Sequence, residues 1–506
     1  MRTENSLKNA IWSMITFGVG LLVSFVARKV FISILGAEYN GLNSLLTSII
    51  SILSIAELGI GTTIVYALYR PLHDKDAGLV CSLMNYYKKC YRVIAGVVLI
   101  VGVAIIPFLP TIVGSINLDI NVYLVYLLFL AEAVLSYLLS YRRSLLIADQ
   151  KERVIKYIHL ASIVLMNAVQ IALLFLTKDY YLFLVIRIIF TCAENIIISM
   201  VVNKKYSYIL EKAYPLPRAI KNALNRKIRA MFYHQIGGFV VNGSDNIMIS
   251  MIFGVTEVGY YNNYFMIVSS LHSLVSNVFS SITASIGNLL VSKNCRDSMN
   301  AYRGILGINY ILAAFISCSF YVCAQPFMQI WLGSEYVMSN LVVGSLAVYL
   351  YFRMMKLTTG AFKNAAGIFY EDRFVPIVES IVNIAASLIC AHLFGISGII
   401  MGTVISNFVL YFGSYPFIAY RKVFKTSAKL YFQQHISYLV LTIAVDALII
   451  LATAVIKTGN PVIELIKNFV VTVVVYAGVF MFLKMSNSSF DAIMKRVIMK
   501  ISKRKK

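Results

Sequence analysis

The stretch VSFVARKVFISILGAEYNGL, residues 23–42, ends a long apolar run with a turn framed by two glycines. The run extends from Ala10 to Leu35, which is long enough to cross a bilayer as a helix. It is too long for the apolar core of a signal peptide and lacks a convincing cleavage site, so we interpret it as a retained helix. Arg28 and Lys29 lie inside it, and cations at membrane depth require an explanation.

The whole chain has the composition of a helical membrane protein. Of its 506 residues, 59% are hydrophobic and only 13% are charged, whereas about a quarter of the residues in a soluble protein are charged. Apolar runs of spanning length recur along the chain, while the strands of a membrane barrel would be shorter, about 10 residues, and alternating. The sequence therefore predicts an all-α polytopic membrane protein.

We expect about fourteen transmembrane helices, arranged as two pseudo-symmetric six-helix lobes followed by two C-terminal helices. The expected spans are residues 10–35, 42–69, 91–113, 121–146, 155–177, 180–202, 230–253, 258–290, 303–324, 339–362, 374–394, 397–419, 435–456 and 463–484.

The charge of the connections supports this order of spans. If the N-terminus is cytoplasmic, the cytoplasmic segments are all basic or mixed with Lys and Arg: 70–89, 142–153, 203–229, 292–303, 363–373, 421–429 and the tail 494–506. The opposite connections contain only Lys178 and Lys457 as basic residues. This alternation follows the positive-inside rule and predicts that both termini are cytoplasmic. It also explains the net charge of +23 without nucleic-acid binding.

The chain repeats itself at an offset of 218 positions. Gly36 and Gly41 frame GAEYNG after the first span, and Gly254 and Gly259 frame GVTEVG after the seventh. The same offset places NKKY (203–206) on RKVF (421–424). We therefore expect an N-lobe at 1–215, a C-lobe at 216–425, and residues 426–506 as two further helices and a basic tail. Two halves of equal orientation are an arrangement found in transporters.

The sequence contains few signs of catalytic or metal chemistry. Its seven cysteines form no CxxC pair and no cluster with the spacing of metal ligands. No nucleotide-binding P-loop occurs. We therefore expect no metal, no cofactor and no catalytic residue.

Two segments carry a family resemblance. GAEYNGLNSLLTSIISILSIAELGIGTTIVYALY (36–69) resembles the first-loop and second-helix region of bacterial polysaccharide flippases, and NGSDNIMISMIFGVTEVGYYNNYFMI (242–267) resembles the start of their second half. These flippases form the polysaccharide-transporter branch of the MATE/MOP flippase superfamily. The resemblance covers roughly residues 5–425 and rests on patterns of Gly, acidic and aromatic residues.

The resemblance implies a V-shaped, two-lobed bundle whose central cavity faces each side of the membrane in turn. It also implies the cargo, an oligosaccharide repeat unit linked to undecaprenyl diphosphate, flipped from the cytoplasmic to the outer leaflet for capsule, O-antigen or related polymers. The implied location is the bacterial cytoplasmic membrane. The implied partners are membrane lipids and polymerases or glycosyltransferases of the same pathway, with no nucleic acid.

Several cations inside the expected spans could bind a diphosphate. They are Arg28, Arg187, Arg353 and Lys356. Arginine offers a planar fork to phosphate oxygens, and charged hydrogen bonds are strong. We predict that these cations line the cavity. The alternative for Arg28 is an ion pair with an acid such as Glu132, and Lys29 could instead extend to the membrane surface.

Four acids in the spans are candidates for ion coupling or for internal pairing: Glu57, Glu132, Glu194 and Asp245. Asp245 resembles an acid at the matching place in relatives and could bind a coupling Na⁺ or H⁺. Its alternative role is a structural hydrogen bond to Asn242, Ser244 or a neighbouring helix. Arg187 and Glu194 lie two turns apart on one helix face, so each is expected to meet another helix.

Two other functions compete with the flippase. A multidrug or small-solute exporter of the same superfamily would need an acidic, aromatic cavity for cationic drugs, whereas the cations predicted here favour an anionic cargo. A membrane polysaccharide polymerase generally resembles proteins with a large outer loop. The longest outer connection here, around QPFMQIWLGSEYVM (325–338), is too small for a catalytic domain.

Overall fold

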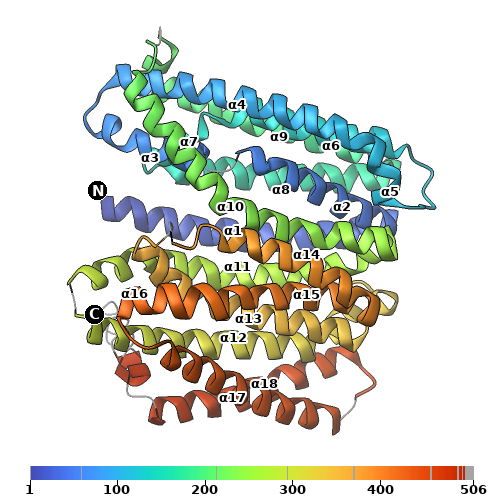
Figure 1. The fold of residues 1–506 in the computed structure, drawn as a ribbon. Coiled ribbons are helices and arrows are strands. Elements are labelled where there is room, and N and C mark those ends of the chain that lie inside the picture. The colour runs from blue at the N-terminus through green and yellow to red at the C-terminus, as the bar shows by residue number, and fades with distance from the viewer. Residues whose placement is uncertain are drawn as a thin grey trace. The chain divides into compact units, whose positions relative to one another are not determined.

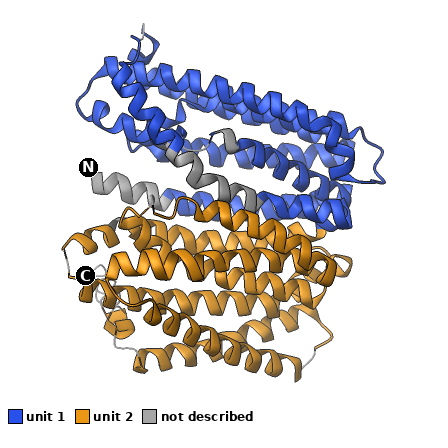
Figure 2. Cartoon of the chain, in the orientation of Figure 1, with its two compact units in different colours: residues 1–259 blue, residues 260–506 orange. Residues whose placement is uncertain are grey.

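A computed structural model of the chain describes residues 2–57, 60–211, 214–292, 294–368, 371–455, 458–486, 489–492 and 494–495. The chain forms two compact units, residues 1–259 and 260–506 (Figure 2). Every regular element among the described residues is helical, which confirms the predicted all-α class (Figure 1).

Unit 1 consists of ten α-helices and three short 3-10 turns, with α8 packed between α1 and α9, and α6 between α4 and α9. The elements are α1 (Arg2–Leu35), α2 (Ala37–Leu53), η1 (Ser54–Glu57), α3 (Ile60–His73), α4 (Ala77–Ile105), η2 (Ile106–Phe108), α5 (Leu109–Val113), α6 (Val122–Ser140), α7 (Arg143–Ala148), α8 (Glu152–Thr177), α9 (Tyr180–Lys205), η3 (Ser207–Leu210) and α10 (Arg218–Phe253).

Unit 2 holds almost all of α11 and the elements that follow, with α12 packed against α13 and α18. The elements are α11 (Val255–Ser292), α12 (Cys295–Trp331), η4 (Ser334–Tyr336), α13 (Asn340–Ala365), α14 (Val375–Phe394), α15 (Ile396–Val409), the π-helix η5 (Leu410–Tyr420), α16 (Arg421–Phe424), α17 (Ala428–Val455) and α18 (Pro461–Ser486).

Twelve helices in the described part of the chain are long and apolar enough to cross a membrane. The predicted spans 42–69 and 230–253 are not among them. The first is divided into α2, η1 and α3, with residues 58–59 outside the described part, and the second lies within α10, where the side chains of residues 230–242 are not described. The chain is thus a multi-pass membrane protein, and the count of fourteen stays a prediction.

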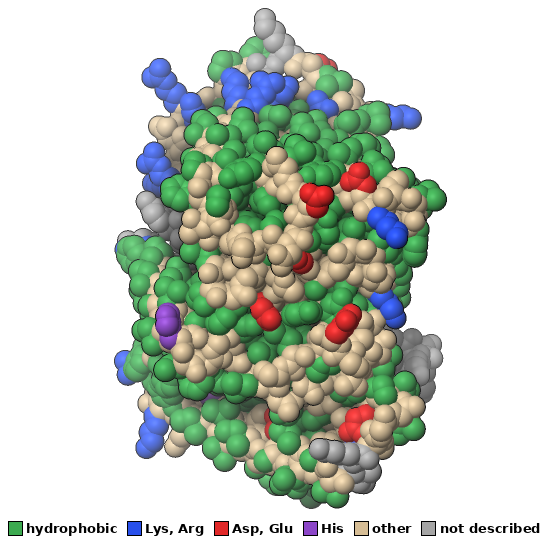
Figure 3. Space-filling view, turned by 90° about the vertical axis from the view of Figure 1, so that its right-hand side faces the viewer, with side chains coloured by type: hydrophobic (Ala, Val, Ile, Leu, Met, Phe, Trp, Pro, Cys, Tyr) green, Lys and Arg blue, Asp and Glu red, His purple; other side chains and the backbone are tan. Residues whose placement is uncertain are grey.

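The surface of the molecule matches this assignment. Large apolar side chains are exposed along the spans, including Leu22 at 69%, Ile100 at 72% and Val474 at 66%. The space-filling view shows hydrophobic side chains over much of the visible face, with Lys and Arg mainly toward its edges (Figure 3). Such exposure is costly in water but favourable against lipid tails.

The repeated glycine turns meet each other inside unit 1. Gly36 and Gly254 end α1 and α10 with φ of 97° and 94°, a conformation that L side chains rarely adopt. Five residues later, a Cβ at Gly41 would fall well within 3.0 Å of the Val255 carbonyl oxygen, and a Cβ at Gly259 would do the same to the Ala37 carbonyl oxygen. These two contacts exchange under the 218-position offset, so the repeat is also a local structural symmetry.

The placement of α10 bears on how the halves are divided. Asn246 of α10 donates to the Ser48 hydroxyl at 2.8 Å, and Ser250 donates to the carbonyl of Ile112 at 2.8 Å. Helix α10 therefore packs with unit 1, and the compact units divide at residues 259 and 260. The six-helix lobes 1–215 and 216–425 describe the repeat in the sequence and stay a prediction.

Unit 2 has its own close helix pair and an irregular helix. Gly398 and Gly402 let α15 approach the backbone of α14 at Cys390 and Ser387, where any Cβ would clash. After α15 the chain continues as the π-helix η5, which contains Pro416. π-Helical turns are rare in proteins, and those that do occur are often found at functional sites.

The glycine crossing generates the first prediction. Gly41→Ala and Gly259→Ala should each lower the unfolding free energy by about 1–3 kcal/mol, because the added methyl meets backbone atoms that cannot rotate away. The measurement is the thermal unfolding midpoint of the purified protein in detergent. Gly20→Ala in α1 is the matched control, since nothing lies within 4 Å of its Cβ position and we expect no loss there. Equal midpoints for all three variants would contradict a tight crossing.

Candidate functional site: charged groups within the membrane helices

Arg28 of α1 is held at the glycine crossing by a neutral side chain. Its Nη1 donates to Asn40 Oδ1 at 2.7 Å, and Asn40 Nδ2 donates to the Gly259 carbonyl at 3.1 Å. Asn40 is 1% exposed, whereas Arg28 is half-buried and the neighbouring Lys29 is exposed. Among the described residues no carboxylate pairs with Arg28, so its charge and its remaining N–H donors are left available.

Arg187 of α9 pairs with Glu132 of α6. Its Nε and Nη2 lie 2.7 and 2.6 Å from Glu132 Oε2, and Thr191 donates to Oε1 at 3.0 Å. The guanidinium also covers the Phe129 ring, 4.2 Å from its centroid. Glu132 is therefore the partner of Arg187 and not of Arg28, which is held by Asn40. This ion pair joins α6 to α9, so its primary effect is to hold these two helices together.

Glu194 meets other helices, as expected from its spacing to Arg187. Arg143 of α7 donates to it at 2.6 Å, and His159 Nδ1 of α8 lies 3.2 Å away. Arg143 Nε also donates to Asn195 at 3.0 Å. Sequence reasoning missed both partners, because Arg143 falls in a segment predicted as a cytoplasmic loop and His159 in an ordinary apolar run. The contact fixes α7 against α8 and α9.

Glu57 ends a chain of hydroxyl groups in unit 1. Ser144 donates to Tyr87 at 3.1 Å, Tyr87 donates to Tyr91 at 3.0 Å, and Tyr91 donates to a Glu57 carboxylate oxygen. Tyr87 and Tyr91 lie one helical turn apart on α4, a spacing that the sequence shows but that no sequence rule connects to Glu57. The structure therefore places Glu57 in an internal contact.

Asp245 is buried, 8% exposed, on α10. It takes part in a polar interaction, and its neighbour Asn246 bonds Ser48. The side chain of Asn242, one of its expected alternative partners, lies outside the described residues. The role of Asp245 in coupling stays a prediction.

In unit 2 two cations share one side of α13. Arg353 Nη1 donates to the Tyr349 hydroxyl at 2.8 Å, and Lys356 Nζ donates to Asn407 of α15 at 2.7 Å. The nearest carboxylate to Lys356 is Glu379 of α14 at 3.9 Å, too long for a hydrogen bond, and Arg353 has no ion pair among the residues described. His272 of α11 lies within electrostatic reach of both cations. This group is positive and only partly neutralised.

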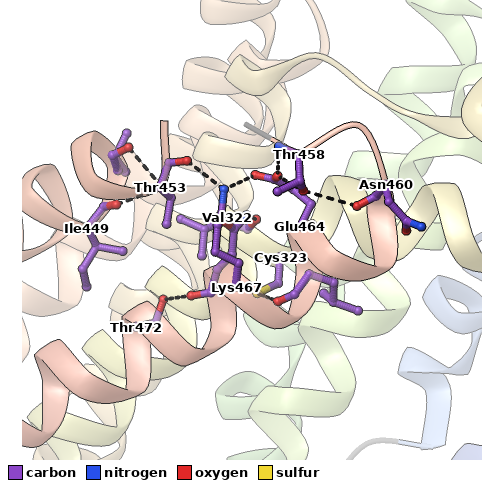
Figure 4. A network of polar contacts seen from close by, with 12 residues as sticks. Val322, Cys323, Ile449, Thr453, Thr458, Asn460, Glu464, Lys467 and Thr472 are labelled. Atoms are coloured by element: carbon purple, nitrogen blue, oxygen red, sulfur yellow. Dashed lines mark hydrogen bonds and ion pairs between the residues drawn. The ribbon is translucent and has the colours of Figure 1, made fainter. Parts of the chain in front are cut away.

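Two further ion pairs in unit 2 are structural. Lys363, in the last turn of α13, pairs with the buried Asp372, which also accepts from Ser414 of η5 at 3.0 Å. In the C-terminal helices, Lys467 donates to Glu464 at 2.7 Å and to the Thr453 carbonyl at 3.0 Å (Figure 4). Sequence reasoning missed these pairs because it assigned the residues to a loop and to a helix end.

The α17–α18 pair is attached to α12 by polar contacts. Asn468 of α18 donates to the Val322 carbonyl of α12 at 2.7 Å, and it lies one residue after Lys467 of the Glu464–Lys467 pair. Within this pair, Asp446 of α17 accepts from the Tyr476 hydroxyl of α18 at 2.6 Å. In the part of the chain that the structure describes, no three His, Cys, Asp or Glu side chains gather as a metal site.

Known structures with a similar fold include a lipid flippase and MATE transporters. The chain aligns with the lipid II flippase MurJ in an inward closed conformation at a TM-score of 0.66 and 15% identity, over 97% of this chain and 100% of that one. An inward-facing multidrug resistance MATE family transporter of the MOP superfamily gives a TM-score of 0.62 and 15% identity, over 79% and 95% of the two chains. At this identity the likeness establishes the fold.

A third similar structure, a mutant of the Vibrio cholerae MATE transporter VcmN, has a TM-score of 0.56 and 16% identity, covering 85% of this chain and 100% of that one. No curated protein sequence matches the chain. A family model described as "Polysaccharide biosynthesis protein" matches residues 6–285, more than half of the sequence. The chain, which has the MATE/MOP fold, therefore belongs to the polysaccharide biosynthesis protein family, as its glycine, acidic and aromatic patterns predicted.

Proposed function

We propose that the protein flips undecaprenyl-diphosphate-linked oligosaccharide repeat units from the cytoplasmic to the outer leaflet by alternating access, for the assembly of a surface polysaccharide. It would act in the bacterial cytoplasmic membrane with both termini in the cytoplasm, as a transporter and not as an enzyme. The family supplies the polysaccharide context. The observation that carries the proposal is that each unit holds a cation at membrane depth without a full counter-charge.

Arg28 in unit 1 and Arg353 in unit 2 have the properties that a diphosphate requires. Each is half-buried and hydrogen-bonded to a neutral oxygen, of Asn40 and of Tyr349 respectively. A charged group inside a span costs at least ~2.5 kcal/mol near the centre of the bilayer. A neutral partner offsets less of this cost than a carboxylate would. An anionic cargo would complete the compensation, which would explain why the charges are retained.

The remaining two predicted cations differ from this pair. Lys356 is shared between Asn407 and the distant Glu379, so we assign it a supporting role beside Arg353. Arg187 is neutralised by Glu132, so we assign it to the framework of unit 1. Moving a diphosphate outward is downhill in an inside-negative cell, by about 2.3 kcal/mol per charge per 100 mV if the full field is crossed. A coupled Na⁺ or H⁺ at Asp245 would add to this.

Removing the phosphate-binding cations should stop transport without preventing folding. Arg28→Gln and Arg353→Gln should each reduce flipping at least roughly tenfold, because each removes charged hydrogen bonds to phosphate. The measurement is polymer export, together with accumulation of lipid-linked repeat units on the cytoplasmic side, in cells whose own copy of the gene is deleted. Lys29→Gln, one residue from Arg28 and exposed, is the matched control and should keep normal export.

Export at the normal rate in the Arg28→Gln/Arg353→Gln double variant would overturn the diphosphate assignment. If the purified protein transports a cationic drug and the double variant does so equally well, multidrug export becomes the better-supported function. The amount of inserted protein is measured in the membrane fraction of the same cells.

Mutation of the Arg187–Glu132 pair tests whether Arg187 has a structural role or binds cargo. Arg187→Ala should destabilise unit 1 by roughly 3 kcal/mol, because it leaves a partly buried carboxylate without its partner. The double change Arg187→Gln/Glu132→Gln should restore much of that loss. Thermal unfolding in detergent measures both. An Arg187→Ala protein of normal stability that no longer flips cargo would instead place Arg187 in the cargo site.

Asp245 can be tested for coupling in proteoliposomes that hold lipid-linked oligosaccharide. With Na⁺ and H⁺ gradients imposed separately, Asp245→Asn should flatten the dependence of flipping on one of them, because an amide cannot exchange a proton or neutralise a cation. The basal rate without a gradient shows whether the variant is folded. A gradient dependence identical to that of the unmodified protein would reject coupling through Asp245.

A further inference from the structure

Unit 1 contains a groove of about 880 Å³ that the proposed transport mechanism does not use. One face of α4 forms its floor, with side chains recurring every three or four residues: Ser82, Asn85, Lys89, Val93, Val97 and Val101. From Ser82 to Val101 this face is roughly 28 Å long at ~1.5 Å per residue. The groove is therefore elongated along a membrane helix, with a length comparable to the hydrocarbon core of a bilayer.

The two halves of the groove differ in chemistry. Around residues 82–89 of α4 the groove has polar side chains, Asn85, Tyr86 and Lys89, which are joined by Lys221 of α10 and by Tyr214, Pro215 and Leu216. Farther along α4 the lining is aliphatic, and Ile52, Leu53 and Ile60 also line the groove. A ligand that fills both halves must have a polar end and a long apolar end.

The polar end is built by a specific contact. Tyr86 donates to Asn225 of α10 at 2.6 Å, which ties the start of α10 to α4 and brings Lys221 to the groove. Lys89 and Lys221 are both exposed, and neither has an ion pair in the part of the chain described. Two ammonium groups at one end of a groove are complementary to an anion.

The apolar half is accessible from the side of unit 1. Val93, Val97 and Val101 are 66%, 42% and 44% exposed, although they lie deep in a spanning helix. Lys89 closes the segment 70–89, which the charge pattern of the sequence places on the cytoplasmic side. The cationic end of the groove would then lie at the height of the cytoplasmic lipid headgroups, and its apolar end beside the lipid tails.

We propose that this groove binds one anionic phospholipid of the cytoplasmic leaflet, with its phosphate between Lys89 and Lys221 and an acyl chain along Val93, Val97 and Val101. The headgroup end offers two flexible lysines, which suit a small phosphate at the membrane surface. Anionic lipids are abundant in that leaflet and are attracted by each nearby Lys or Arg. The site shares no residue with the proposed cation sites, so it stands independently of the transported cargo.

The first test measures lipid binding by native mass spectrometry of the full-length protein, delipidated in mild detergent and titrated with phosphatidylglycerol. Lys89→Gln/Lys221→Gln should weaken binding about 10- to 30-fold, because two lysine–phosphate attractions are lost. The matched control is Lys88→Gln/Lys204→Gln, which removes two lysines that do not line the groove. This control should bind phosphatidylglycerol as the unmodified protein does.

The second test fills the apolar half without changing charge. Val97→Trp should abolish binding, because the indole occupies the path of the acyl chain. Val103→Trp is its control, on the same helix and 48% exposed but outside the groove. Thermal unfolding of both variants verifies that they fold. The first test removes the charge at one end of the groove and the second blocks its aliphatic part, so the two tests are independent.

Three results would overturn the proposal. One is equal affinity for phosphatidylcholine, which would remove the role of the lysines. Another is equal loss of binding in a groove variant and its control. The third is retention of polyprenyl phosphate without any phosphatidylglycerol, which would make the groove a cargo site. Selective binding of phosphatidylglycerol that both groove variants lose and both controls keep would support it.

Discussion

The reciprocal contact of two glycine turns is the constraint on which the organisation of unit 1 depends. Gly41 lies against the Val255 carbonyl and Gly259 against the Ala37 carbonyl, so backbone meets backbone with no space for a side chain. Asn40 spans this contact by donating to Gly259, and Arg28 is anchored to Asn40. The position of the first intramembrane cation is therefore a consequence of the crossing, because the amide that holds it is itself fixed by the glycines.

The second principle of the structure is selective neutralisation of charge. Within the membrane helices Glu132, Glu194 and Glu464 each have a cationic partner at hydrogen-bonding distance. These pairs join neighbouring helices or brace one helix end, and a cation without its acid would be costly there. Arg28 and Arg353 depart from this rule, since both are held by neutral oxygens. Among the described residues their charges are therefore not neutralised by an acid, which is the property that the proposed anion site requires.

The sequence predicted the helical membrane class, the order of most spans and the family, because apolar run length, charge alternation and glycine placement are local signals. The partners of individual charges were harder to predict. Arg187 and Glu132 are 55 positions apart and Arg143 and Glu194 are 51 apart, so their pairing depends on which helices pack together. Hydropathy places a charge at a depth but does not specify the face of a helix that meets its neighbour. The Tyr87–Tyr91–Glu57 chain was missed for the same reason, since tyrosines in a span also suit the membrane interface.

The π-helix of residues 410–420 makes the two halves of the repeat mechanically unequal. Under the 218-position offset it corresponds to residues 192–202, which lie in the uninterrupted α-helix α9. A π segment with an internal proline has fewer regular backbone hydrogen bonds than an α-helix, so it bends more readily. Of these two matching segments, residues 410–420 form a π-helix and residues 192–202 form part of a regular α-helix. If the chain transports as proposed, we therefore expect bending to concentrate in residues 410–420, while α9 stays straight.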